Sequence, residues 1–210
     1  MVLNRERSRF EMLLSPLARL FARTKPDTLT WLAIIFSAAC AFAVFFSTTG
    51  RLYLLEIAAV LLALSGLMDA LDGVVARNTG RTSKKGDFLD HVLDRYADIF
   101  LVIGINFSSL TTLKFLGIFA LTGILMTSYL GTQSQALGLK RNYGGPLGRA
   151  DRLVLMLIAF LIQIGIVLGM HTTGKLFGLT TFDYLLIVFA VVGHITAVYR
   201  AAASWRLLSP

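Results

Sequence analysis

The chain has 210 residues, of which 56% are hydrophobic and 15% are charged, and its mean hydropathy is +0.72. A soluble domain carries about 25% charged residues, so this composition excludes an ordinary soluble protein and predicts a single polytopic membrane domain. The formal charge is +8, yet basic and aromatic residues are not interleaved along any segment, which argues against nucleic-acid binding and favours a positive bias toward a membrane surface.

The first predicted element is an amphipathic helix from Phe10 to Phe21. Its apolar residues recur at helical spacing, and arginines occupy the other faces. We expect this helix to lie on an anionic membrane surface, and packing against the rest of the protein is the alternative. The chain is therefore divided into a cytoplasmic interfacial helix, residues 1–25, and a membrane domain, residues 26–210.

Six apolar stretches follow, and each is long enough for a transmembrane helix, which needs about 20 residues. Short segments rich in glycine, polar or basic residues separate them. The sequence therefore predicts an all-α membrane protein with six transmembrane helices. The expected spans are approximately 30–48, 52–77, 86–110, 113–139, 153–170 and 182–205.

The second and third spans carry an unusual concentration of acid. Six of the twelve acidic residues fall between Asp69 and Asp98. Asp69 and Asp72 are three residues apart on one helix, and Asp90 and Asp94 are four apart on the next, so each pair projects from one helix face. A carboxylate deep in a spanning helix costs roughly 2.5–3.5 kcal/mol. Four of them in this setting predict a shared ligand that compensates their charge.

Two divalent cations are the expected ligand of these carboxylates. Shared among four acids, they would bring the local charge near zero and leave a positive field for a phosphate-bearing molecule. Hard carboxylate oxygens favour Mg²⁺ or Mn²⁺ over softer metals. The sequence therefore predicts a binuclear metal site at one end of the second and third spans.

A second group of charges, this time basic, surrounds a glycine-rich loop after the fourth span. Arg149 and Arg152 are three residues apart at the start of the fifth span and are spaced like a fork for a phosphate dianion. Arg200, near the end of the sixth span, is expected to join them or to reach the lipid head groups. This loop is therefore a candidate phosphate site.

The distribution of charge also predicts the topology. With both termini and the two basic loops on one side, the other side keeps only Arg51, Lys114 and Lys175. By the positive-inside rule both termini, and with them the acidic site, are expected to be cytoplasmic in a multi-pass protein of the cell membrane.

The stretch from Asp69 to Asp94 resembles the signature of the CDP-alcohol phosphotransferases. It reads Asp-x2-Asp-Gly-x2-Ala-Arg-x8-Gly-x3-Asp-x3-Asp and is complete over 26 residues. The resemblance implies a six-helix membrane enzyme, a homodimer in similar proteins. Such an enzyme transfers the lipid phosphoryl group of a CDP-lipid to an alcohol and releases CMP.

The same resemblance implies a role for each matching residue. Asp69, Asp72 and Asp90 would ligate metal, and Asp94 would be the general base and touch metal as well. Asp27 would either face the cavity, where we assign it to the acceptor, or cap a helix. The residues expected around the CDP group are Asp69, Gly73, Ala76, Arg77 and Gly86, and those expected around the acceptor are Arg149, Arg152, Arg200 and Asp27.

The acceptor is expected to be an inositol phosphate. The segment 93–98 resembles the family members that use this acceptor, and the segments 131–136 and 148–152 are similar to their archaeal branch, which implies a phosphatidyl-type (archaetidyl) donor. Bacterial members carry basic residues where this chain has Thr132 and Ser134. Glycerol phosphate and serine are the alternative acceptors, and a cation transporter is a distant alternative because intramembrane carboxylates also mark ion paths.

Overall fold

The computed structural model of the chain describes residues 7–140, 142–170 and 175–208, so the first six residues of the predicted interfacial segment lie outside the described part. The described residues form seven α-helices and one short antiparallel hairpin, which confirms the all-α prediction. The elements are α2 (Arg7–Leu20), α3 (Pro26–Phe46), α4 (Tyr53–Asn78), α5 (Lys84–Phe107), α6 (Leu116–Ala136), α7 (Arg149–Met170), β1 (Lys175–Leu176), β2 (Leu179–Thr180) and α8 (Thr181–Leu208).

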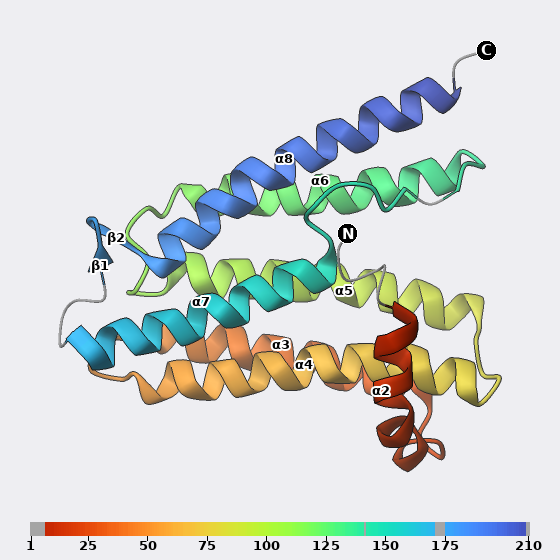
Figure 1. Cartoon of the computed structure of the whole chain (residues 1–210), viewed down its shortest axis with the longest axis horizontal. Helices are drawn as coiled ribbons and strands as arrows, with labels where there is room; N and C mark the ends of the chain where they lie inside the picture. Colours follow the sequence, from red (N-terminus) through yellow and green to blue (C-terminus); the bar gives the residue numbers. More distant parts are fainter. Residues whose placement is uncertain (1–6, 141, 171–174, 209–210) are drawn as a thin grey trace.

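The six long helices, α3 to α8, run roughly along one direction, and α2 crosses them (Figure 1). The end of α4, the start of α5 and the ends of α6 and α8 gather on one side, shown on the right of the figure. The hairpin of β1 and β2 lies at the opposite side. This arrangement brings the acid-bearing parts of α4 and α5 together at one end of the bundle.

Local sequence explains where several helices begin. Pro26 is the first residue of α3, where its missing N–H leaves no hydrogen bond unmade. The Ser83 hydroxyl accepts from the N–H of Gly86 at 3.0 Å and caps α5. Thr180 and Asp183 cap α8 reciprocally, because each backbone N–H donates to the other side chain, at 2.9 and 3.2 Å.

Five of the described helices, α3, α4, α6, α7 and α8, are long and apolar enough to cross a membrane. The helix α5 has 24 residues, which is long enough, but its first half is too charged to belong with them. Asp94 on that half, and Asp98 one turn further on, direct their carboxylates at arginines of α5 and α7 rather than outward. Length and composition therefore confirm five of the six predicted spans, and the span assigned to α5 stays a prediction.

The helices approach one another closely at small side chains. A Cβ on Gly193 of α8 would lie only 3.0 Å from the carbonyl carbon of Gly123 in α6, and the Thr127 hydroxyl donates to the Gly193 carbonyl at 2.9 Å. Ser37 of α3 and Ser65 of α4 share a hydrogen bond of 2.7 Å. Close backbone approach and interhelical hydrogen bonds of this kind hold helices together where lipid removes the hydrophobic driving force.

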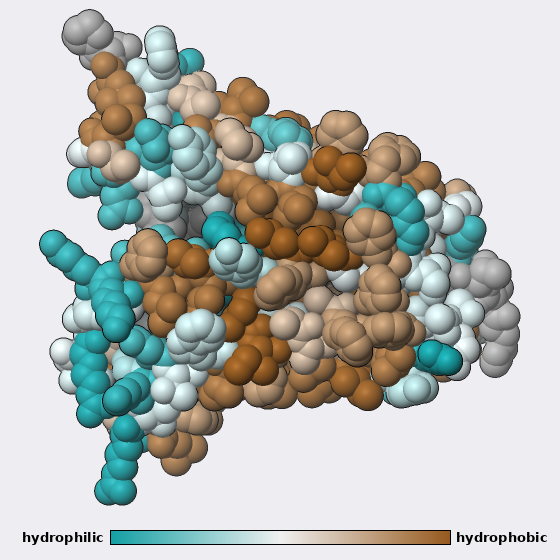
Figure 2. Space-filling model, turned by 180° about the vertical axis from the view of Figure 1, so that it is seen from behind, coloured by the Kyte–Doolittle hydropathy of each residue, from teal (hydrophilic) through white to brown (hydrophobic). Residues whose placement is uncertain are grey.

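The surface has the pattern of a membrane protein. Figure 2 shows, on the face in view, an apolar belt across the middle of the molecule between more polar ends, and a hollow divides the most hydrophilic end. Large apolar side chains such as Phe42, Val60, Ile118 and Val198 are between 59% and 69% exposed. A soluble monomer does not expose so large a continuous apolar surface, and a bilayer covers it naturally.

The amphipathic helix α2 rests on the second half of α4 (Figure 1). Leu14 and Leu17 pack against a cluster that includes the buried Leu71 and Val75, whereas Leu20 is 78% exposed. One face of α2 thus packs on the protein, as the alternative from the sequence expected. Its contact with a membrane surface stays a prediction.

Candidate active site

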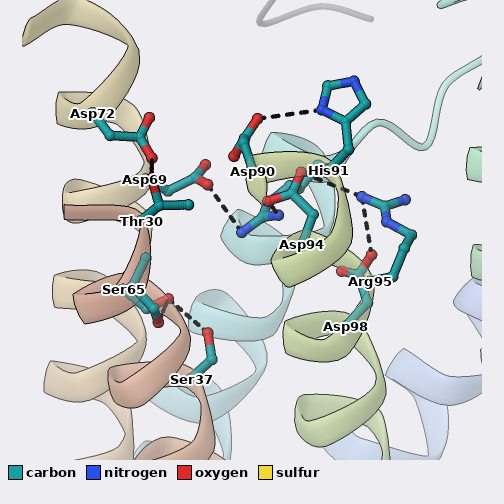
Figure 3. A network of polar contacts seen from close by, with 12 residues as sticks. Thr30, Ser37, Ser65, Asp69, Asp72, Asp90, His91, Asp94, Arg95 and Asp98 are labelled. Atoms are coloured by element: carbon teal, nitrogen blue, oxygen red, sulfur yellow. Dashed lines mark hydrogen bonds and ion pairs between the residues drawn. The ribbon is translucent and has the colours of Figure 1, made fainter. Parts of the chain in front are cut away.

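Three of the predicted metal ligands meet between α4 and α5 (Figure 3). One carboxylate oxygen from each of Asp69, Asp72 and Asp90 lies within 4.8 Å of the other two. The Thr30 hydroxyl of α3 donates to Oδ2 of Asp72 at 2.7 Å and so fixes the orientation of that carboxylate. Three hard oxygen donors converging from two helices fit a divalent cation such as Mg²⁺ or Mn²⁺.

The fourth carboxylate, Asp94, lies beside this triad but is engaged by arginines. Its Oδ1 contacts Nη1 of Arg149, and its Oδ2 lies 3.4 Å from Nη2 of Arg95. The same Arg149 brings Nη2 to 3.1 Å from Oδ1 of Asp69. Only 16% of the Arg149 side chain and 14% of the Asp94 side chain are exposed. One guanidinium from α7 therefore bridges the acids of α4 and α5.

A buried ion pair lies one helical turn further along α5. Nη2 of Arg152 is 2.6 Å from Oδ2 of Asp98, and each side chain is only 2% exposed. Arg95 approaches the same oxygen at 3.7 Å. The two arginines expected to form a fork, Arg149 and Arg152, therefore contact different carboxylates.

Arg200 of α8 fastens the glycine-rich loop that leads into α7. Its Nε donates to the Gly144 carbonyl at 2.8 Å and its Nη1 donates to the Thr127 carbonyl of α6 at 2.6 Å. Gly145 in this loop has φ of +97° and a Cβ there would collide with the Thr196 side chain, so the position requires glycine. Arg141, at the start of the loop, lies outside the described residues.

A cavity of about 910 Å³ joins these features. The acid triad and Asp94 line it together with Arg149, Arg152 and Arg200, so the loop and the acids belong to one space. Every residue that the sequence assigned to the metal, the CDP group or the acceptor borders this cavity. They are Asp27, Asp69, Asp72, Gly73, Ala76, Arg77, Gly86, Asp90, Asp94, Arg149, Arg152 and Arg200.

Two glycines border the cavity, Gly73 on α4 and Gly86 on α5, and polar groups approach the backbone of both closely. A Cβ on Gly73 would lie 3.0 Å from Nη1 of Arg77, so the arginine folds back over the glycine. A Cβ on Gly86 would lie 3.3 Å from the Ser83 hydroxyl and 3.4 Å from Oδ1 of Asp27. Larger residues at these two positions would displace polar groups that border the cavity.

Three neighbours of the acids did not emerge as site residues from the sequence. His91 lies with Nδ1 3.5 Å from Oδ2 of Asp90, and its position four residues after Asp87, whose Oδ1 is 3.8 Å away, was a usable signal. Arg95 similarly directly follows the base candidate in the chain. Thr30 gave no local signal, since its partner is 42 residues away.

An acid cluster beside arginines, in a large cavity at one end of a helical membrane bundle, is typical of a membrane enzyme that handles phosphate groups at a metal site. The model of the family described as CDP-alcohol phosphatidyltransferase matches residues 23–196. The chain therefore belongs to the CDP-alcohol phosphatidyltransferase family and is a transferase of phospholipid biosynthesis.

Curated relatives and solved structures agree with this assignment. The chain is 35% identical to the archaetidylinositol phosphate synthase of Methanothermobacter thermautotrophicus over 71% of this chain and 70% of the relative. It is 36% identical to the synthase of that name from Aeropyrum pernix over 78% and 81%. The phosphatidylinositol phosphate synthase of Mycobacterium tuberculosis with CDP-DAG bound superimposes with a TM-score of 0.71 at 26% identity, over 92% of this chain and 94% of that one. A structure of that enzyme in complex with manganese and citrate gives 0.70, over 90% and 88%.

Proposed function

We propose that this enzyme transfers the phosphatidyl-type (archaetidyl) group of a CDP-lipid to a hydroxyl of an inositol phosphate and releases CMP. The observation that carries the proposal is the single cavity lined both by the four carboxylates of the signature and by Arg149, Arg152 and Arg200. A site for an uncharged alcohol needs no such second group of cations. The names of the relatives, which include synthases of archaetidylinositol phosphate and phosphatidylinositol phosphate, support the same acceptor.

The metal would be held by Asp69, Asp72 and Asp90, with Asp94 at its edge, and we propose two Mg²⁺ or Mn²⁺ ions. When bound, they supply the positive charge that neutralises the pyrophosphate and stabilises the leaving CMP. The convergence of three carboxylate oxygens within 4.8 Å supports at least one such ion. The structure of a relative with manganese supports a divalent metal in this family.

The chain's own residues would then position the donor. Asp69, Gly73, Ala76, Arg77 and Gly86 border the α4 and α5 side of the cavity. The two glycines and the alanine leave room for the cytidine, and Arg77 supplies a guanidinium for the phosphates. The lipid tails of the donor would lie against the apolar surface that adjoins the hollowed, hydrophilic end (Figure 2).

In the transfer step the acceptor hydroxyl oxygen attacks the phosphorus next to the lipid. A new phosphorus–oxygen bond forms, the bond from that phosphorus to the bridging oxygen breaks, and CMP leaves with this oxygen. We propose Asp94 as the group that takes the hydroxyl proton, because it borders the cavity beside the acid triad. Arg149, Arg152, Arg200 and Asp27 are proposed to bind the acceptor, the arginines through its phosphate.

We further propose that both termini and the active site face the cytoplasm and that the enzyme is a homodimer of the cell membrane. The basic residues Lys84 and Lys85 lie at the acidic end of the bundle, whereas Lys175 lies in the hairpin at the other end (Figure 1). This asymmetry supports the orientation by the positive-inside rule. A cytoplasmic site also gives the cavity access to soluble inositol phosphate.

The acceptor is tested with purified protein, Mn²⁺ or Mg²⁺ and a CDP-lipid. Inositol phosphate, unphosphorylated inositol, glycerol phosphate and serine are supplied separately at equal concentrations, and CMP release is measured with each. We expect inositol phosphate to give the highest kcat/KM. A higher value with glycerol phosphate or serine would reassign the acceptor while leaving the family chemistry intact.

A further inference from the structure

The acceptor hydroxyl and Arg149 compete for the carboxylate of Asp94. The proposed transfer requires this carboxylate to accept a proton from the acceptor hydroxyl, but Arg149 already contacts its Oδ1 through Nη1. Its other oxygen, Oδ2, lies 3.4 Å from Nη2 of Arg95, so both oxygens of Asp94 face an arginine and a donor hydroxyl finds neither oxygen open. Something must therefore draw Arg149 away before Asp94 acts.

Arg149 is also well placed to meet an incoming phosphate. It borders the cavity and is the first residue of α7, directly after the glycine-rich loop. Its Nε and Nη1 are buried and have no hydrogen-bond partner among the described residues, so ion pairs alone hold the guanidinium and it keeps donors for an anion. A phosphate dianion competes well with carboxylates for such a group, because it accepts two parallel N–H bonds and carries more charge.

The surroundings confine this exchange to one side chain. Arg152, one turn further along α7, is fixed to the buried Asp98 at 2.6 Å and so holds the start of the helix in place. Arg95, the other cation near Asp94, lies on α5 itself and is shared with Asp98. Of these three arginines, Arg149 alone bridges Asp94 to Asp69.

We propose that Arg149 is a positioning residue that gates Asp94, holding its carboxylate until the phosphate of the acceptor draws the guanidinium away. This inference rests on the proposed function, since it assumes a phosphorylated acceptor. It assigns Arg149 a second role besides binding: the acceptor phosphate, remote from the reacting hydroxyl, releases the base. Binding energy from a remote group is thereby used at the reacting centre.

The gate protects the donor from water. A cavity of about 910 Å³ that admits an inositol phosphate also admits water, and size cannot exclude the smaller nucleophile. If Asp94 were free, a water oxygen would attack the lipid phosphorus, its proton would pass to Asp94, and CMP would leave with the bridging oxygen. The products would be CMP and a lipid phosphate monoester, so the CDP-lipid would be wasted.

The first test uses the wild-type protein and supplies the two parts of the acceptor, the alcohol and the phosphate-like anion, as separate molecules. Purified wild-type protein receives CDP-lipid, metal and unphosphorylated inositol, with or without inorganic phosphite, a small dianion that stands in for the acceptor phosphate. We expect phosphite to raise CMP release about tenfold or more, the scale of one interaction between charged groups. An unchanged rate at saturating phosphite would overturn the gate.

The second test removes the guanidinium. Arg149→Gln should raise CMP release from CDP-lipid in the absence of any acceptor by about tenfold or more, lower transfer to inositol phosphate, and lose the response to phosphite. Arg149→Lys keeps the charge but loses the two parallel N–H donors, and its rate of CMP release without acceptor should lie between those of the wild type and Arg149→Gln. Lys85→Gln is the matched control, since it removes one exposed positive charge at the same end of the bundle away from the cavity.

A gain of hydrolysis cannot come from a misfolded protein, and CDP-lipid affinity measured on each variant checks that the donor site is intact. A transfer-active wild type whose Arg149→Gln variant hydrolyses CDP-lipid no faster would contradict the gate alone. A wild type that releases no CMP with any acceptor would instead contradict the proposed function. The two failures are therefore distinguishable.

Discussion

Thr30 shows how a single residue outside the signature supports the acid cluster. It comes from α3, whereas the acids come from α4 and α5, and its hydroxyl donates to Asp72 at 2.7 Å. A hydrogen bond to a metal-ligating carboxylate fixes the direction of its lone pairs. Neighbours of this kind contribute to metal affinity although they do not touch the ion.

We expect Thr30→Val, which keeps the shape and removes the hydroxyl, to weaken Mn²⁺ binding by about 10- to 100-fold. Ser37→Ala is the control, because Ser37 lies on the same helix and bonds to Ser65 instead of an acid. Titration of the purified proteins with Mn²⁺, followed by calorimetry, measures both. Equal affinities in wild type and Thr30→Val would show that Asp72 is not a ligand oriented by this residue.

Asp94→Asn separates the two roles proposed for Asp94. If it is the general base, the variant should bind CDP-lipid normally while its turnover falls by about 10²- to 10⁴-fold. Donor affinity and kcat are measured on the same preparation. A loss of affinity as large as the loss of rate would make Asp94 a metal ligand only.

The signature made most residues of the acid cluster predictable from the sequence. Spacings of three and four residues fix which face of a helix Asp69, Asp72 and Asp90 occupy, whatever the rest of the fold does. The bridge from Arg149 to Asp94 was not predictable, because it depends on how α7 approaches α5 across 55 residues of chain. Sequence alone therefore grouped the arginines correctly in one cavity but not their partners.

The helices α5 and α7 are joined by the buried pair of Asp98 and Arg152. Each side chain is 2% exposed, so water does not solvate either charge if the pair is broken. A pair of this kind adds little stability compared with apolar residues, but breaking it leaves an uncompensated buried charge. The pair thus fixes the relative position of the two helices that carry Asp94 and Arg149.

Arg152→Met should therefore lower the free energy of unfolding by about 3–5 kcal/mol, and the double variant with Asp98→Leu should recover much of that loss. Arg206→Met, at the exposed end of α8, is the control. Unfolding in detergent, followed by circular dichroism, gives the comparison. A double variant as unstable as Arg152→Met would refute the compensation.

For the whole molecule, hydropathy was sufficient to predict the number and order of the long helices. Their bounds differ from the expected ones by up to four residues, as at α3, which begins at Pro26 rather than near 30, and at α7, which begins at Arg149 rather than near 153. At α7 the apolar pattern begins near residue 153, but the helix extends back to Arg149 through charged residues, of which Arg149 and Arg152 border the cavity and Arg152 also pairs with Asp98. The packing of α2 across α4 depends on tertiary contacts and could only be offered as an alternative.

The orientation in the membrane is a property of the whole chain and can be tested with two cysteines. In a variant without Cys40, a cysteine in place of Lys84 should react with a membrane-impermeant maleimide only from the cytoplasmic side. One in place of Lys175 should react only from outside, since the two positions lie at opposite ends of the bundle (Figure 1). The reverse labelling would orient the cavity away from the cytoplasm.

The proposed transfer is tested most directly by measuring, in one reaction, the labelled acceptor that enters the lipid and the CMP that is released. Purified protein is given a CDP-lipid, Mn²⁺ and ¹³C-labelled inositol phosphate, and the products are analysed by mass spectrometry and chromatography. We predict one labelled phospholipid, with its phosphate retained, for each CMP released, and neither product when a chelator removes the metal. CMP without label in the lipid, or full activity in the presence of the chelator, would contradict the proposed transfer.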